Sequence, residues 1–228
     1  MRRWGLIVTL FYALVLLLLL LPGALALASK HVTVTSLLRY TIEGLSSGYL
    51  WICAGILAAG EALLLFLSVD STWRRHRPRA HVAVTALLTG FFIALLASAA
   101  IWSLWIGFPW PLWNLGRSLN EAFLIEAVTV FASFWALWGA LFYLYYRDAS
   151  NPVAAAVSWL LKGSVLELLI AVPTHVVVRQ RGDCTAPHVT AYGIVTGIAI
   201  MLLCFGPGVL ALYRKKYDAY RGSNAERG

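Results

Sequence analysis

The sequence predicts an all-α fold, a polytopic transmembrane helix bundle of about six spans. Three observations support it: 61% of the 228 residues are hydrophobic, only 12% are charged, and the mean hydropathy is +0.77. A soluble domain carries roughly twice this share of charged residues. The apolar runs are also too long and too numerous for a soluble core of this size. We therefore expect residues 1–228 to form a single integral membrane domain, with the lipid bilayer as its main partner.

Six apolar segments come near or exceed the roughly 20 residues that a membrane-crossing helix needs. They are Trp4–Ala28, Tyr49–Val69, Val82–Trp105, Ala122–Tyr146, Pro152–Val178 and Val189–Leu212. The first segment also resembles a secretory signal, because Arg2 and Arg3 precede a Leu-rich run that ends in Ala26-Leu27-Ala28. Cleavage after Ala28 would leave five spans. Because the apolar run is longer than signals usually have, we expect residues 1–28 to be retained as the first span.

The basic residues predict the orientation of these helices. The densest cluster, Trp73–Arg79, lies between the second and third spans, and the positive-inside rule places it in the cytoplasm. Six spans put Arg2, Arg147 and the basic tail 213–228 on that same side. We therefore expect both termini in the cytoplasm, and the short loops favour a bacterial-type inner membrane. The net charge of +8 gathers beside apolar segments, where it attracts lipid head groups, so no nucleic-acid partner is expected.

A recurring pattern predicts an inverted internal repeat. His81-Val82, Thr89-Gly90 and Leu95-Leu96 recur at constant spacing as His188-Val189, Thr196-Gly197 and Leu202-Leu203. Spans two and three would then correspond to spans five and six with opposite orientation, a plan common in secondary transporters. The alternative is chance similarity among residues that membrane helices use often.

Two glutamates lie near the middle of these related spans, Glu61 in span two and Glu167 in span five. An ionised side chain in hydrocarbon costs several kcal/mol unless it is paired, hydrated or neutralised. The pair is therefore a candidate midplane site for a proton or cation, with Glu126 as a secondary candidate. The alternative is a neutral carboxyl that hydrogen-bonds a neighbouring helix. Lys162 could counter one of the carboxylates, but we expect its side chain to extend to the cytoplasmic interface.

A polar cluster is expected where spans five and six meet on the outer face. Its members are His175, Arg179, Arg181, Asp183 and His188. Pro173 should kink span five just before His175 and so turn the imidazole toward the bundle. His175 and His188 could together ligate a haem, or join Cys184 in binding copper or zinc, and interfacial hydrogen bonding is the alternative.

Two cysteines, Cys53 and Cys184, are expected near the outer surface, where an oxidising compartment would allow a disulfide between them. Cys204 is expected to be a small buried apolar group.

Three function classes fit these features. A transporter explains the midplane carboxylates and the repeat, and it is the interpretation that we favour. A redox subunit would use the outer histidines to hold a haem or metal, and a structural or assembly subunit would act with other membrane subunits. The absence of a recognised catalytic motif leaves enzyme activity open, because membrane enzymes assemble their sites from scattered residues. No cofactor or solute can be named from the sequence.

Overall fold

The structure is a computed structural model that describes residues 2–20, 33–46, 48–70, 79–107, 121–149, 151–181 and 186–225. Within these ranges the regular elements are seven helices, and no strand is present. The helices are α1 (Arg2–Leu18), α3 (Val34–Leu45), α4 (Gly48–Asp70), α5 (Arg79–Gly107), α6 (Glu121–Arg147), α7 (Pro152–Gln180) and α8 (Ala186–Ala225). The predicted all-α helix bundle is thereby confirmed.

The apolar runs of the sequence account for the long helices. Helices α5, α6, α7 and α8 contain stretches long and apolar enough to cross a membrane, and α1 and α4 contain the shorter apolar stretches Ile7–Leu18 and Trp51–Leu67. The protein is thus a multi-pass helical membrane protein with between four and six spans. The described part of the predicted first span is α1, which packs against α4 and α8. Retention of residues 1–28 stays a prediction.

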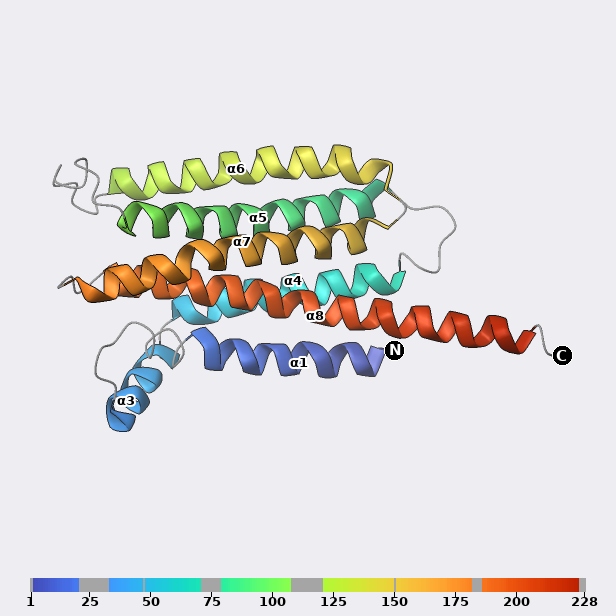
Figure 1. Ribbon diagram of the computed structural model, residues 1–228, viewed down its shortest axis with the longest axis horizontal. Helices are drawn as coiled ribbons and strands as arrows, with labels where there is room; N and C mark the ends of the chain where they lie inside the picture. The colour runs from blue at the N-terminus through green and yellow to red at the C-terminus, as the bar shows by residue number, and fades with distance from the viewer. Residues whose placement is uncertain are drawn as a thin grey trace.

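Helix α8 occupies the centre of the bundle (Figure 1). It packs along much of its length against α7, and it also contacts α5, α4 and α1. Helix α6 lies at the far side of α5 and contributes little to the centre. The main buried cluster joins residues of α1, α4, α5, α7 and α8, with Leu16, Leu64, Leu160 and Leu203 fully buried among them. The core therefore forms around α8.

The connections divide between the two ends of the bundle (Figure 1). At one end, here called the terminal end, α1 begins, α4 gives way to α5, α6 gives way to α7, and α8 ends. At the other, the α3 end, α4 and α8 begin and α5 and α7 end. The basic segments were predicted to lie on one side of the membrane. The helix ends that they adjoin all lie at the terminal end, although residues 71–78 lie outside the described residues.

The segment between the first two predicted spans, Ser29–Gly48, contains the short helix α3. The exposed apolar side chains of α3 recur about once per turn and form a stripe along one side of the helix. They are Val34, Leu38, Ile42 and Leu45. The Trp51 indole donates a hydrogen bond to the Leu45 carbonyl over 2.8 Å, which fixes α3 to the start of α4. An apolar stripe on a helix beside two apolar spans suits the membrane interface.

The predicted repeat pairs α4 with α7 and α5 with α8. These pairs do not pack alike, because α7 and α8 contact each other along much of their length whereas α4 and α5 barely touch. The inverted repeat therefore stays a prediction from the sequence, and the helix packing gives it no support.

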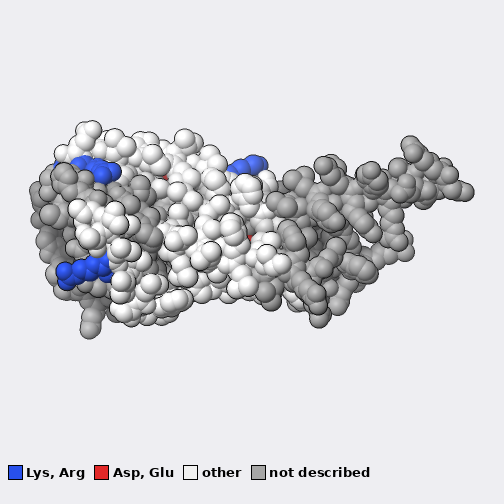
Figure 2. Space-filling view, turned by 90° about the horizontal axis from the view of Figure 1, so that it is seen from below, with Lys and Arg blue, Asp and Glu red and all other residues white. Residues whose placement is uncertain are grey.

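The surface of the bundle is largely uncharged. On the face seen in Figure 2, Lys and Arg of the described residues gather mainly at one end, and Asp and Glu are almost hidden. The exposed side chains of α6 include Val128, Phe134 and Leu144, as expected for a helix that faces lipid. Buried acidic groups, rather than surface ones, are thus the unusual charges of the molecule.

Close packing between α5 and α6 depends on two glycines. A Cβ atom at Gly90 would lie 2.6 Å from the backbone nitrogen of Gly139 and 2.8 Å from its Cα. Beside this contact the Trp135 indole donates to the Leu87 carbonyl over 3.0 Å, and Phe91 meets Phe131 edge to face. Small residues at such crossings let two backbones approach closely.

We predict that Gly90→Ala destabilises the bundle by about 1–3 kcal/mol, because the new methyl group would overlap backbone atoms that cannot move aside. Unfolding of the purified protein by SDS in mixed micelles measures the change. Gly55→Ala is the matched control, since a Cβ at Gly55 has no atom within 4 Å. Equal unfolding midpoints for the two variants would contradict the proposed role of the crossing.

Candidate functional site

Glu167 of α7 is buried against the backbone of α8. Its side chain is 2% exposed, and neither carboxyl oxygen has a hydrogen-bond partner among the described residues. A Cβ at Gly193 would lie 3.3 Å from Oε1 of Glu167, and a Cβ at Gly197 would overlap Oε2. The two glycines, four residues apart on one face of α8, therefore provide the space that the carboxyl occupies.

Two buried serines accompany this carboxyl. Ser103 of α5 is 1% exposed and lies beside the same glycine, since a Cβ at Gly193 would be 2.9 Å from its hydroxyl oxygen. Ser164 is fully buried on α7, three residues before Glu167 and so on the same face. Neither hydroxyl has a hydrogen-bond partner in the described structure. We call Glu167, Ser103 and Ser164, together with Gly193 and Gly197, the α7 site.

Glu61 of α4 is buried against a different part of α8. Its side chain is 1% exposed, and its Oε2 has no hydrogen-bond partner among the described residues. A Cβ at Gly206 would lie 2.8 Å from Oε1 of Glu61 and 3.2 Å from Val8 of α1. Tyr12, one turn after Val8, donates a hydrogen bond to the Ala199 carbonyl over 3.0 Å and lies close enough to Glu61 to interact electrostatically. We call Glu61, Gly206 and Tyr12 the α4 site.

The structure places these sites apart. Gly206 follows Gly197 by nine residues, which corresponds to two and a half turns and about 14 Å along α8. The two carboxyls therefore contact opposite faces of α8 at different heights, Glu167 toward the α3 end and Glu61 toward the terminal end. The sequence predicted a shared midplane depth, but the structure gives two separate sites.

Aliphatic side chains separate the two sites. Ile200 and Leu203 are fully buried on α8 between Gly197 and Gly206. They belong to the central apolar cluster that also contains Leu64, Phe92 and Leu96. Aliphatic side chains therefore lie between the carboxyl of one site and the carboxyl of the other.

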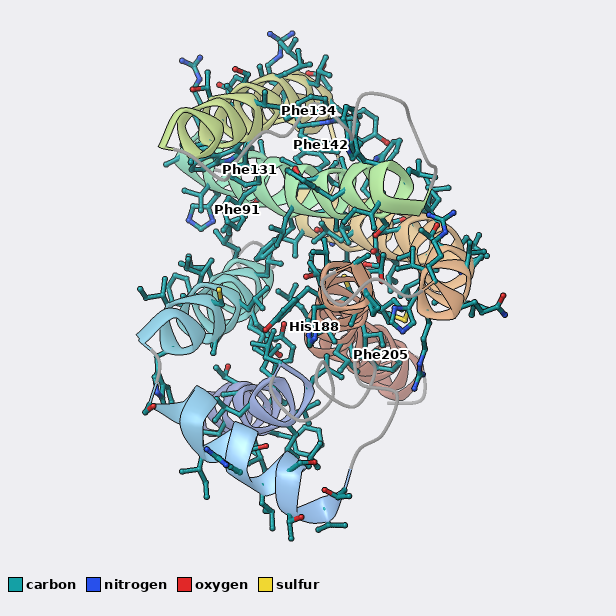
Figure 3. All side chains as sticks on the ribbon, turned by 90° about the vertical axis from the view of Figure 1, so that its left-hand side faces the viewer. Phe91, Phe131, Phe134, Phe142, His188 and Phe205 are labelled. Atoms are coloured by element: carbon teal, nitrogen blue, oxygen red, sulfur yellow. The ribbon has the colours of Figure 1, made fainter. Side chains whose placement is uncertain are left out.

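The outer polar cluster divides around α8. Nδ1 of the buried His175 hydrogen-bonds the Thr190 hydroxyl over 2.7 Å, and Thr190 lies two turns from Gly197, on the α7 side of α8. His188 is exposed and lies eighteen residues, or five turns, before Gly206, so it is on the α4 side. Figure 3 shows His188 on that side of α8, toward α4 and α1. The paired imidazoles expected for a haem are therefore not brought together.

Arg181 links two helix ends. Its guanidinium donates to the Gly107 carbonyl over 2.7 Å and to the Ile106 carbonyl over 3.3 Å, and so caps the carboxyl end of α5. Arg179 lies half-buried one residue before the end of α7. Asp183 lies outside the described residues. The cluster thus holds α5, α7 and α8 together at the α3 end.

The remaining predicted residues lie away from both carboxyls or outside the described structure. Lys162 is exposed, and its amine lies 5.6 Å from the Trp159 ring centroid, so it does not pair with Glu167. Glu126 is on α6, but its side chain is not among those described. Cys53 is half-buried and forms no disulfide with another described residue, and Cys204 is buried, as expected. Cys184 lies outside the described residues, so its disulfide with Cys53, and its part in a copper or zinc site, stay predictions.

Several residues of the two sites were not predicted from the sequence as site residues, although Gly197 is part of the recurring Thr196-Gly197 pattern. They are Ser103, Ser164, Tyr12, Gly193, Gly197 and Gly206. The spacing of Gly193 and Gly197 is the small-xxx-small pattern of closely packed membrane helices and could have indicated a close approach. Single serines in apolar helices carry no such signal, because most bond their own backbone.

Comparison of the chain with known protein families, with curated proteins and with solved structures gives no match. The functional argument therefore depends on the residues of the two sites.

We predict that Thr190→Val destabilises the protein by about 1–3 kcal/mol, because it removes the hydroxyl partner of a buried imidazole. Thr196→Val is the matched control on the same helix, since the Thr196 hydroxyl bonds only its own helix, at the Tyr192 carbonyl 2.8 Å away. The control should change stability by less than about 0.5 kcal/mol. Urea or SDS titration measures both variants, and a control as destabilised as Thr190→Val would rule out the predicted role of this bond.

Proposed function

We propose that the protein is a secondary transporter that couples movement of a small solute or ion to a proton or another small monovalent cation. The observation that carries the proposal is the burial of two carboxyls, Glu61 and Glu167, inside apolar helices, where neither forms an ion pair with a cationic side chain of the described residues. A carboxylate in hydrocarbon is stable only when a proton, a cation or a polar partner neutralises it. Reversible binding of a proton or cation is therefore the chemistry that these groups can perform.

The arrangement around α8 supports a transport cycle with two half-sites. Glu167 lies toward the α3 end and Glu61 toward the terminal end, with the aliphatic barrier of Ile200 and Leu203 between them. A barrier between two ion sites is what alternating access requires, because the sites must not open to both sides of the membrane together.

Helix α8 also has a point at which it can bend. Pro207 lacks a backbone N–H, so the Leu203 carbonyl loses its intrahelical donor, and Gly206 and Gly208 flank the proline. This weak point adjoins the carboxyl of Glu61. A small bend of α8 there would change the environment of the α4 site while leaving the α7 site packed.

We predict that Glu61→Gln and Glu167→Gln each abolish cation-coupled movement of the solute while leaving the protein folded, because Gln keeps the shape of the side chain but cannot ionise. Each variant would be reconstituted in liposomes, and solute uptake and internal pH would be followed in a proton gradient and in a sodium gradient while candidate solutes are supplied. Asp148→Asn is the matched control, since Asp148 is an exposed carboxylate paired with Arg147 at 3.7 Å. If wild type moves a solute and both Gln variants move it equally well with the same pH dependence, the carboxyls are structural.

The proposed orientation places the terminal end of the bundle in the cytoplasm of a bacterial-type inner membrane, because Arg2, Arg147 and the basic tail belong to that end. We predict that single cysteines introduced at Arg75 and Ser223 are protected from an impermeant thiol reagent in intact cells, and that a cysteine at Thr35 of α3 is labelled. The background is a chain with its three native cysteines replaced. Labelling of the first two from outside would reverse the orientation.

A further inference from the structure

We propose that the α7 site, formed by Glu167, Ser103 and Ser164 beside Gly193 and Gly197, binds a sodium ion. The inference rests on the proposed function, because it names the coupling cation of one of the two sites. Its support is independent of any transport measurement and comes from the hydroxyl groups that surround the carboxyl.

The two serines differ from the other buried Ser and Thr side chains of the described helices, Thr85, Thr89, Thr174 and Thr190. Eight described Ser and Thr hydroxyls bond the backbone carbonyl four residues earlier in their own helix, the usual arrangement in membrane helices. They are Thr41, Thr85, Thr89, Ser98, Ser133, Thr174, Thr190 and Thr196. The hydroxyls of Ser103 and Ser164 are buried and do not make this bond. Both of these buried exceptions belong to the α7 site.

The oxygen atoms converge from two helices on the backbone of a third. Oγ of Ser103 and Oε1 of Glu167 would lie 2.9 Å and 3.3 Å from the same Cβ position at Gly193. Ser164 projects from α7 one turn before Glu167. A buried polar oxygen without a partner costs about 1–3 kcal/mol, so this concentration of them is unfavourable unless a ligand is bound.

The chemistry of these groups selects the ligand. Carboxylate and hydroxyl oxygens are ligands for hard cations, and the site contains no imidazole or thiol that would favour copper or zinc. One carboxylate balances a single positive charge, which favours a monovalent over a divalent ion. A proton would use the carboxyl alone and would leave both serines without a role. A dehydrated sodium ion uses all three side chains.

The α4 site lacks these features and provides an internal comparison. A Cβ at Gly206 would lie beside Oε1 of Glu61, Val8 and Leu65, and the nearby Tyr12 hydroxyl already donates to the Ala199 carbonyl. Among the described residues, the buried serine hydroxyls without a partner lie on α5 and α7, and none lies on α1 or α4. We expect sodium to bind at the α7 site only.

Sodium binding can be measured on the full-length protein in detergent or liposomes. Equilibrium binding of radioactive sodium gives the affinity, and the thermal unfolding midpoint is compared in sodium chloride and choline chloride at equal ionic strength. Sodium should raise the midpoint of the wild type, because a ligand that binds only the folded state stabilises it. Glu167→Gln should abolish both effects, and Ser103→Ala and Ser164→Ala should each weaken binding by on the order of tenfold or more.

Two variants serve as matched controls. Ser98→Ala removes a hydroxyl that bonds its own helix at the Ala94 carbonyl, and Glu61→Gln removes the other buried carboxyl. Both should bind sodium like the wild type. Midpoints in choline chloride show whether each variant is folded, so loss of binding in a folded serine variant is specific.

The outcomes separate this inference from the proposed function. Equal midpoints in sodium and choline for the wild type, or serine variants that bind sodium as the wild type does, would overturn the sodium site. If solute flux is proton-coupled, requires Glu167 and does not depend on sodium, the transport proposal is supported and the coupling ion is a proton. Sodium binding without any solute movement would instead support the site and remove the transport proposal.

Discussion

The close approach of neighbouring side chains to the backbone of α8 is the constraint on which the rest of the bundle depends. Apolar side chains gain little by leaving lipid for one another, so membrane helices associate through tight packing and polar contacts. Gly193 and Gly197 admit Glu167, whereas Gly206 admits Glu61 and Val8. Because these glycines lie on two faces of α8, the helix can hold α7 and α5 on one side and α4 and α1 on the other.

The same geometry determines what the two carboxyls can do. A pair in direct contact could share one proton or hold one divalent ion, but two groups on opposite faces of α8, offset by about 14 Å along its axis, cannot. Ile200 and Leu203 fill the interval with aliphatic carbon. An ion that visits both carboxyls can therefore pass between them only if α8 moves, which is what the proposed carrier requires.

The sequence predicted the helices well because apolar length is a local property. Predicted spans two to five agree with α4 to α7 to within three residues at each end, and α8 begins three residues before the sixth. The relation between Glu61 and Glu167 is not local. Counting residues from the helix ends placed both carboxyls near the midplane. The face of α8 that each carboxyl contacts depends on how the helices are rotated and offset, and short apolar patterns do not determine this. For the same reason His175 and His188 could be assigned to one end of the bundle but not to opposite faces of α8.

The hydrogen bonds of the buried polar groups divide them into two kinds. Those near the helix ends and on α1 have partners: His175 bonds Thr190, Arg181 bonds the end of α5, and Tyr12 bonds the α8 backbone. These contacts fix how the helices meet, and satisfied polar groups of this kind are ordinary in a stable bundle. The α7 site differs, because the carboxyl of Glu167 and the hydroxyl of Ser103 lie there beside the same glycine, Gly193, and neither has a hydrogen-bond partner among the described residues. Single unpartnered polar atoms also occur at Glu61, Trp138 and Tyr146. At the α7 site, however, unpartnered oxygen atoms of two helices lie beside the same glycine, and a bound cation would satisfy them together, which packing alone does not do.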